Sequence, residues 1–349
     1  MTAQIPKVKF YLKKTQLINR PGMSGKIAIV GAFDSLETSP QLFNTVGEAQ
    51  QTFGTDDTYN GCAVVPYLFK GGAESLLAVN ITTESEGTRS KTITTTNLAE
   101  ALAKIKGEEW DILFIAEPLT DTFIPIINAY VQECFELKYP CGYIGALTGA
   151  SVSANVTSAG LVNDWCYGLN TQSFTVDGET LSVLESTAYY TGLIAGMNVG
   201  NTMTYKAIKN VTGVSPELSF ETGGDGKTLL EAGILTVKCA NRSEGTYIVM
   251  NSELPNGLDL YINRTRDYIV KEMSLHQFLG EKNREATLDE IKQELDRIKE
   301  MCVNTLDLLE DINYTVQKKD VNCVDIYIDS LVFAGLITEI DVYVKIEVI

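Results

Sequence analysis

Four apolar runs in the first half of the chain alternate with segments of helical pattern, and this alternation restricts the fold more than any other feature. The runs IAIVGAF, SLLAVNI, DILFIAE and CGYIGAL begin at residues 27, 75, 111 and 141. Strands that are apolar on both faces and alternate with helices are typical of a parallel sheet covered on both sides. The sequence therefore predicts an α/β fold with a mostly parallel sheet flanked by helices, with helices over 44 to 53, 60 to 70, 97 to 106 and 121 to 138.

The middle of the chain, from about 151 to 240, has a weaker pattern and is rich in Ser, Thr, Asn and Gly. One clear helix is predicted over 183 to 197. A turn and strand at 233 to 237 are expected to form a hairpin with 247 to 250. We therefore assign residues 25–240 to one α/β domain with an irregular middle region.

Two helices are expected in the C-terminal part. The first covers about 259 to 279. The second opens at Thr287 with the capping-box pattern Thr-Leu-Asp-Glu. It is expected to continue to about residue 313, because apolar residues recur at spacings of three and four as far as Ile312. Such a stripe is more typical of a core contact than of a partner groove. Residues 241–349 are predicted to form a C-terminal α+β domain.

Both ends of the chain alternate in the manner of strands, which predicts extended arms at residues 1–24 and at about 339–349. In the N-terminal arm, Val8, Phe10 and Leu12 share one face, and Lys7 and Lys9 share the other. The C-terminal arm has an opposite face with Asp341 and Glu347, and its apolar face consists of Ile340, Val342, Val344, Ile346 and Val348.

The two ends carry opposite charge. Residues 1–20 contain five Lys or Arg and no acid, whereas residues 320–349 contain six acids and one lysine. An unpaired terminal strand with an apolar face is an aggregation hazard. Each arm is therefore expected to pair, either within its own subunit or by adding a strand to the sheet of a neighbouring subunit. In the second case, attraction of Lys7 and Lys9 to Asp341 and Glu347 would help to set the register.

The composition excludes several classes of protein. The 28 basic and 45 acidic residues give a net charge of −17, which disfavours nucleic-acid binding. There is no apolar run of the roughly 18 residues that a membrane span needs, and the first residues lack the apolar stretch of a secretory signal. The seven cysteines are dispersed without a CxxC pair, which predicts reduced thiols.

No pattern of catalytic or ligand-binding residues is present in the sequence. The single histidine, His276, has no partners at metal-ligand spacing, and no GxSxG motif is found. The loop GGDGKT at residues 223–228 resembles the end of a phosphate-binding loop, but Glu221 occupies the position of the first glycine. The first strand lacks GxGxxG as well. We therefore predict no catalytic residue, no metal and no cofactor, and we interpret the loop as a turn before a helix.

Seven stretches, taken in order, resemble contractile tail sheath proteins, the family shared by contractile-tailed phages, R-type bacteriocins and related injection systems. They are KIAIVGAF, NTVGEAQQTFG, NGCAVVPYLFKGGAESLLAVNI, ESTAYYTGLIAGM, EAGILTV, RDYIVKEMSLHQFLGEKN and the alternating terminal strand. The likeness spans nearly the whole chain. The chain is short for the family, so it is similar to a compact sheath without an outer protruding domain.

The resemblance implies a structural, non-enzymatic subunit. In this family, subunits stack as rings, usually hexameric, around an inner tail tube between a baseplate and a tail terminator. Terminal arms add strands to the C-terminal domain of a neighbour. Contraction then drives the tube through a target envelope without nucleotide. The expected location is the tail of a virion or bacteriocin particle, assembled in the host cytoplasm.

Two other hypotheses remain open at this point. A small-molecule enzyme on the α/β half would bind its ligand at the carboxyl ends of the strands. Another tail component, such as a baseplate or terminator protein, would form rings of limited size instead of tubes.

Overall fold

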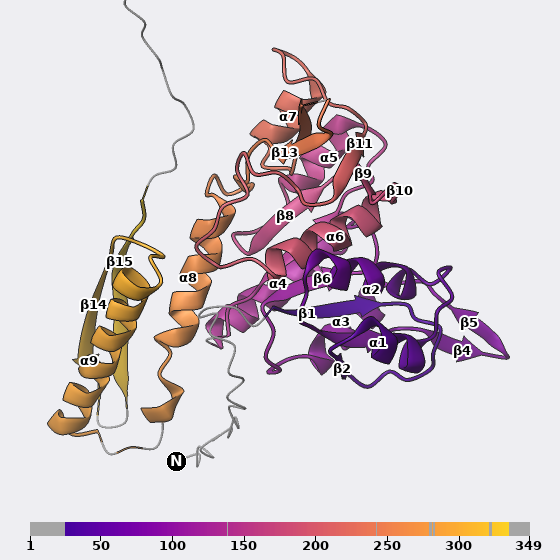
Figure 1. The fold of residues 1–349 in the computed structure, drawn as a ribbon. Coiled ribbons are helices and arrows are strands. Elements are labelled where there is room, and N and C mark those ends of the chain that lie inside the picture. Colours follow the sequence, from indigo (N-terminus) through magenta and orange to yellow (C-terminus); the bar gives the residue numbers. More distant parts are fainter. Residues whose placement is uncertain are drawn as a thin grey trace, which may run out of the picture. The chain divides into compact units, whose positions relative to one another are not determined.

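The computed structural model describes residues 25–137, 139–241, 243–278, 281, 283–320 and 323–334 (Figure 1). Within these residues the chain divides into two compact units. The α/β unit ends at Ser274, and the C-terminal unit begins at Leu275.

A six-stranded sheet forms the centre of the α/β unit, in the order β2-β3-β1-β6-β7-β8. All neighbouring strands are parallel except β2, which is an antiparallel edge strand. This confirms the predicted α/β fold and all four apolar runs as strands. The bounds are β1 Lys26–Gly31, β2 Gln41–Phe43, β3 Ser75–Asn80, β6 Ile112–Ile115, β7 Gly142–Ala146 and β8 Cys166–Asn170.

Helices cover both faces of this sheet, as the alternating pattern predicts. Successive residues of β1 show the division, since Ile27 and Ile29 enter one apolar core while Ala28 and Val30 enter the other. The first core also includes residues of α1, α2 and α6, and the second includes residues of α3, α4 and α5. The bounds are α1 Val46–Phe53, α2 Asn60–Gly71, α3 Thr95–Lys104, α4 Ile124–Glu136, α5 Val152–Ala159 and α6 Val183–Ala195.

Local side-chain caps explain where several of these helices begin. Thr94 and Ser182 each form a reciprocal capping box, with Asn97 and Glu185 respectively. Thr45 accepts a hydrogen bond from the Glu48 N–H at the start of α1. Each cap satisfies backbone donors that the first helical turn leaves without an internal partner.

Glycines allow α2 and α6 to pack with their backbones in close contact. A Cβ atom built on Gly192 would lie 2.1 Å from the Leu68 carbonyl oxygen, and one on Gly71 would lie 2.3 Å from the Tyr189 carbonyl oxygen. Real Cβ atoms do not approach so closely, so any side chain here would push the two helices apart. The two Gly-containing helices that the sequence predicts thus form one packed pair.

The α/β unit also contains other elements around the sheet. Leu235 makes a parallel bridge to Asn170 of β8, and the predicted hairpin is present as β12 and β13. The GGDGKT stretch is only in part the predicted turn before a helix, because Gly223 and Gly224 precede α7 while Asp225 to Thr228 lie inside it. The bounds are β4 Thr83–Ser85, β5 Thr88–Ser90, β9 Ser173–Val176, β10 Glu179–Thr180, β11 Val211–Ser215, α7 Asp225–Glu231, β12 Val237–Asn241, β13 Thr246–Val249 and α8 Leu260–Glu272.

The α/β unit extends further along the chain than the expected domain boundary at residue 240. The hairpin of β12 and β13 and helix α8 belong to this unit. One reason is the pairing of Ala207 with Ile248, and another is the contact of α8 with β8. The predicted helix over 259 to 279 is shorter than expected, because α8 ends at Glu272. A turn with Leu275 at φ 44° and a 3-10 segment, His276–Phe278, follow it.

The C-terminal unit contains helix α9, Glu285–Glu300, and an antiparallel ribbon of β14, Asp311–Lys318, and β15, Val324–Val332 (Figure 1). The prediction of one helix from 287 to 313 is therefore wrong at both ends. Arg284 occupies the N-cap, so Thr287 lies inside the helix. A short π-helical turn, Met301–Thr305, and Asp307 at φ 52° end the helical path before the ribbon begins.

We predict that Gly192→Val destabilises the protein by about 3 kcal/mol, because the added side chain overpacks the contact between α2 and α6. Gly47→Ala is the matched control, since nothing lies within 4 Å of its built Cβ atom. This control should be neutral or stabilise the protein by up to about 0.5 kcal/mol. Urea unfolding followed by circular dichroism measures both effects. An unchanged midpoint for Gly192→Val would contradict the proposed close packing.

Candidate functional site

The predicted arm residues lie outside the residues that the structure describes. The structure therefore shows the body on which the arms are predicted to act, while the arm assignments stay predictions. The residues concerned are Lys7, Val8, Lys9, Phe10, Leu12, Ile340, Asp341, Val342, Val344, Ile346, Glu347 and Val348.

The ribbon of β14 and β15 is a two-stranded sheet with two edges. Its register runs from Asp311 opposite Val332 to Lys318 opposite Val324, with a bulge between Asn313 and Tyr314. In the described part of the chain, no third strand pairs with either β14 or β15. An isolated two-stranded ribbon is marginally stable, so a covering element is needed.

Helix α9 provides that cover on one face of the ribbon. Ile312 is fully buried, and the Tyr314 hydroxyl donates to the Asp296 carboxylate of α9. Lys299 of α9 forms an ion pair of 2.6 Å with Asp311, and its hydrogen bond lowers the pKa of the Asp311 carboxyl. The apolar stripe of the helix faces a core, as predicted, since Leu288, Ile291, Leu295 and Ile298 are buried.

The other face of the ribbon is polar and exposed. Asn313 donates to the Ser330 hydroxyl at 2.9 Å, and Thr315 donates to the Asp329 carboxylate at 2.7 Å. Tyr327, which is 45% exposed, lies on the same side. These cross-strand bonds hold the two strands together without a second covering layer.

The two edges carry backbone groups that can pair with further strands. At the turn between the strands, the Lys319 N–H donates to the Cys323 carbonyl at 3.0 Å. Lys319 and Cys323 therefore form a hydrogen-bonded pair of the antiparallel ladder. Because such pairs alternate in an antiparallel ladder, the N–H and C=O groups of Tyr314, Val316 and Lys318 point to the outer edge of β14. By the same alternation, Val324, Ile326 and Ile328 point to the outer edge of β15. The ribbon is thus a template for strand addition.

Helix α8 is attached to the α/β unit by buried polar contacts. Arg264, which is 6% exposed, donates to the carbonyl oxygens of Met197 and Asn198, at 3.1 and 3.4 Å. These carbonyls follow the C-terminus of α6, where a cation is favourable. Lys271 forms a 2.9 Å ion pair with Asp111, directly before β6.

Asp267 is the central acceptor of this attachment. Its carboxylate accepts from the Tyr167 hydroxyl of β8 at 2.5 Å and from Arg266 Nε at 2.8 Å. Burial raises the pKa of the Asp267 carboxyl, while Arg266 and Tyr167 favour its ionised form. Burial also raises the pKa of the Tyr167 hydroxyl, which remains a donor. The last helix of the α/β unit is therefore fixed across the amino ends of the strands.

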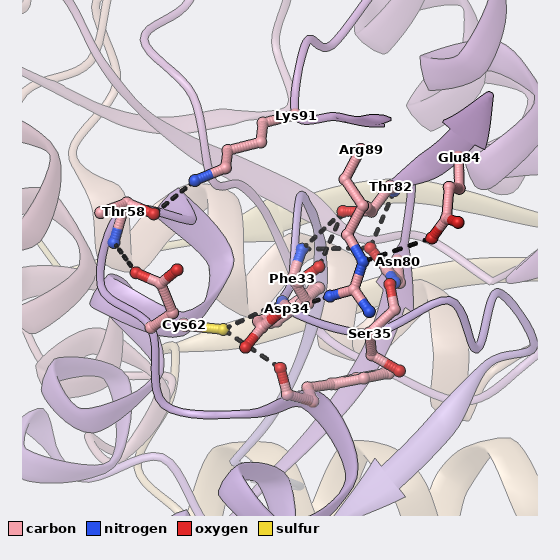
Figure 2. A network of polar contacts seen from close by, with 12 residues as sticks. Phe33, Asp34, Ser35, Thr58, Cys62, Asn80, Thr82, Glu84, Arg89 and Lys91 are labelled. Carbon is pink, nitrogen blue, oxygen red and sulfur yellow. Dashed lines mark hydrogen bonds and ion pairs between the residues drawn. The ribbon is translucent and has the colours of Figure 1, made fainter. Parts of the chain in front are cut away.

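The carboxyl ends of the strands, where an α/β enzyme binds its ligand, contain a network of mutual contacts (Figure 2). The Phe33 N–H donates to Asn80 Oδ1 at 3.0 Å and to Thr82 Oγ1 at 3.1 Å. Arg89 of β5 pairs with Asp34 and, at 3.6 Å, with Glu84 of β4. These bonds hold the exposed hairpin of β4 and β5 against the end of β1.

The first turn of α2 takes part in the same region. The Gly61 N–H donates to the Ala32 carbonyl at 2.8 Å, and Asn60 donates to the Glu117 carboxylate at 2.7 Å. A Cβ atom on Gly31 would lie 2.6 Å from the Ala116 Cβ. The Gly61 N–H, which lies in a first helical turn of the kind that binds phosphate in nucleotide-binding α/β proteins, is here bonded to the protein itself.

The structure also places the single histidine and the seven cysteines. His276 lies in a 3-10 segment, and among the described residues no three His, Cys, Asp or Glu are grouped to hold a metal ion. All seven cysteines are free thiols, as predicted. Within the described ranges, no helix is long and apolar enough to cross a membrane.

Comparison with known proteins finds a known family domain in part of the chain. Residues 91–251 match the family model for the central domain of phage tail sheath proteins. The chain carries a phage tail sheath domain. The resemblance predicted from the sequence is thus confirmed, and the sheath domain spans α3 to β13 of the α/β unit.

Solved structures share the fold of this chain over most of its length. The sheath tail protein of Desulfitobacterium hafniense has 12% identity and a TM-score of 0.68, covering 94% of this chain and 99% of its own. The contracted helical sheath of the anti-feeding prophage has 12% identity and a TM-score of 0.65, covering 99% of both chains. The sheath tail protein of Listeria innocua has 10% identity and a TM-score of 0.64, covering 85% and 89%. A search among curated proteins finds no match.

We predict that Tyr167→Phe destabilises the protein by about 1 to 2 kcal/mol, because buried Asp267 loses a donor. In a double-mutant cycle with Asp267→Asn, the two effects should be strongly non-additive. Tyr205→Phe is the control, since Tyr205 is 49% exposed and should change stability by less than about 0.5 kcal/mol. Chemical denaturation measures the cycle. Additive effects of Tyr167→Phe and Asp267→Asn would contradict a direct contact that attaches α8.

Proposed function

We propose that this protein is the structural subunit of a contractile tail sheath. It polymerises around an inner tube by exchange of terminal strands, and contraction drives the tube through a target cell envelope. The observation that carries the proposal is the ribbon of β14 and β15, whose two edges pair with no further strand among the described residues, in a chain with a sheath domain and two strand-like ends. The family match also supports a non-enzymatic, structural role.

The proposed partners are further copies of the chain, stacked in rings expected to be hexameric, together with the inner tube, the baseplate and the tail terminator. Some of the similar chains come from assemblies of this kind, since the anti-feeding prophage structures are a helical sheath and a baseplate. The proposed location is the tail of a phage or bacteriocin-like particle, assembled in the host cytoplasm.

Strand exchange suits a sheath because it joins subunits firmly but leaves the bodies separate. Backbone hydrogen bonds contribute roughly 0.5 to 1.5 kcal/mol each, and an arm of about six residues makes several of them. The bonds lie at a ribbon edge instead of across the faces of the α/β unit. Bodies joined in this way can repack while their links persist.

The engaged groups at the carboxyl ends of the strands favour this proposal over a small-molecule enzyme. Asp34 is paired with Arg89, and the Gly61 N–H is bonded to Ala32. A ligand at this position would have to displace these contacts and separate the closely packed backbones of β1 and α2.

Deletion of residues 1–20 should abolish polymerisation and leave a folded, dispersed protein, because it removes the predicted N-terminal strand but no described element of the body. Negative-stain electron microscopy of the full chain and the deletion variant, each co-expressed with a candidate tube protein, measures the effect. We expect sheathed or striated tubes only for the full chain. Tubes from the deletion variant would contradict strand exchange, and rings of limited size from the full chain would indicate a baseplate or terminator protein.

Val316→Pro should block strand addition at the β14 edge. Proline removes the outward N–H of this residue, whereas the bonds to β15 come from the alternate residues. Val316→Ala is the matched control, since it loses the same side chain but keeps the N–H. Ile326→Pro with Ile326→Ala tests the β15 edge in the same way. Circular dichroism confirms folding, and electron microscopy measures tube formation. If both proline variants form normal tubes, the ribbon edges are not the docking site.

A further inference from the structure

Two cysteines of the α/β unit lie side by side and have no role in the proposed assembly. Cys134 lies in the last turn of α4, and Cys141 directly precedes β7. Both are buried in the same apolar core, at 7% and 2% exposure, and their thiols are hydrogen bonded to each other. After the helix the backbone returns toward α4, because the Tyr139 N–H donates to the Cys134 carbonyl at 2.9 Å. The two sulfur atoms therefore need to approach by only about 2 Å to reach the length of an S–S bond.

The two thiols have different surroundings. The hydrogen bond with Cys141 lowers the pKa of the Cys134 thiol, whereas burial raises the pKa of the Cys141 thiol. Tyr130, one helical turn before Cys134, has a buried hydroxyl with no partner of ordinary hydrogen-bond geometry among the described residues. This hydroxyl lies beside the Cys134 sulfur, where it can donate to a thiolate. Cys134 therefore has the character of a nucleophile, and Cys141 that of a resolving thiol.

Cys134 is also the thiol that a small molecule in solution reaches first. It is close to the end of α4, and Leu137, directly after the helix, is 47% exposed. The last turn of a helix opens locally more often than a strand in the centre of a sheet. Cys141 is held at the start of such a strand, since the N–H of the next residue, Gly142, donates to the Asp111 carbonyl at 3.2 Å.

We propose that Cys134 and Cys141 form a reversible disulfide by exchange with a low-molecular-weight disulfide. The Cys134 thiolate attacks one sulfur of that disulfide, its S–S bond breaks, and a mixed disulfide forms as the first small thiolate leaves. The Cys141 sulfur then attacks the Cys134 sulfur, and the second small thiol leaves with the proton that Cys141 gives up. The two protein thiols are oxidised, and the external disulfide is reduced to two thiols.

The disulfide joins the end of α4 to the start of β7. It closes a loop of eight residues, from Cys134 to Cys141, and so removes conformational freedom from the unfolded chain. The α/β unit is thereby more resistant to unfolding in an oxidising medium than in a reducing one. This property does not depend on polymerisation, so the inference goes beyond the proposed sheath function.

Peptide mapping of the dispersed full-length protein tests the pair. The native protein is incubated with excess oxidised glutathione, and the remaining thiols are then alkylated. Trypsin cleaves after Lys138, so Cys134 and Cys141 fall in different peptides that only a disulfide joins. We expect these linked peptides from most of the chains, and their loss on addition of dithiothreitol.

Cysteine variants test the assigned roles in the same assay. Cys141→Ala should leave Cys134 joined to glutathione, because the resolving thiol is missing, whereas Cys134→Ala should leave Cys141 unmodified. Cys239→Ala, which replaces a half-buried cysteine of β12, is the control and should keep the linkage between Cys134 and Cys141.

Absence of the linked peptides from the native wild-type protein, or their formation only after denaturant is added, would overturn the proposal. Linkage of Cys134 or Cys141 to a different cysteine, or to another chain, would also overturn it. All of these readouts come from the dispersed chain, so failure of the proposal is distinguishable from failure of the sheath function.

Discussion

The edges of the ribbon of β14 and β15, which pair with no third strand in the part of the chain that the structure describes, are the constraint on which the proposed assembly depends. Helix α9 covers one face of the ribbon, and cross-strand bonds such as Thr315 to Asp329 complete the other. Neither feature covers the edges. A protein that keeps such edges needs a strand to fill them, or it risks uncontrolled aggregation. Two strand-like chain ends, one basic and one acidic, are suitable partners.

The α/β unit has the properties expected of a rigid body. Its sheet is covered on both faces, α2 and α6 are packed through glycines, and the groups at the carboxyl ends of the strands bind one another. Helix α8 is held by Arg264, Asp267 and Lys271, whose burial is tolerable because each has a partner. A body with these contacts can be displaced as a whole without losing its internal structure.

The sequence predicted the strands β1, β3, β6 and β7 well, because each is buried on both faces and its continuous apolar run differs from the pattern of an amphipathic helix. It failed at the end of α9. Leu309 and Ile312 continue the spacing of three and four from Cys302, although they belong to a loop and a strand. Periodicity cannot detect a change of element that happens to preserve the spacing. The sequence analysis also missed β9 and β11, because these strands are short and partly polar and show no clear alternation.

The attachment of α8 was missed for a different reason. Arg264, Asp267 and Lys271 recur at spacings of three and four, which placed them on one face, but charged residues on a helix are usually solvated. Only the position of Tyr167 and the α6 carbonyls shows that this face is buried. The arms were proposed from alternation and charge alone, and the ribbon, which the sequence did not reveal, is their proposed acceptor.

The central claim is that strands from other copies occupy the ribbon edges in the assembled particle. Electron cryo-microscopy of tubes formed by this protein, at a resolution that traces the backbone, measures this directly. The account predicts that β14 and β15 lie within a larger sheet, with terminal segments of neighbouring chains bonded to their edges. An assembled tube in which the ribbon remains two-stranded, with both edges facing solvent, would contradict it.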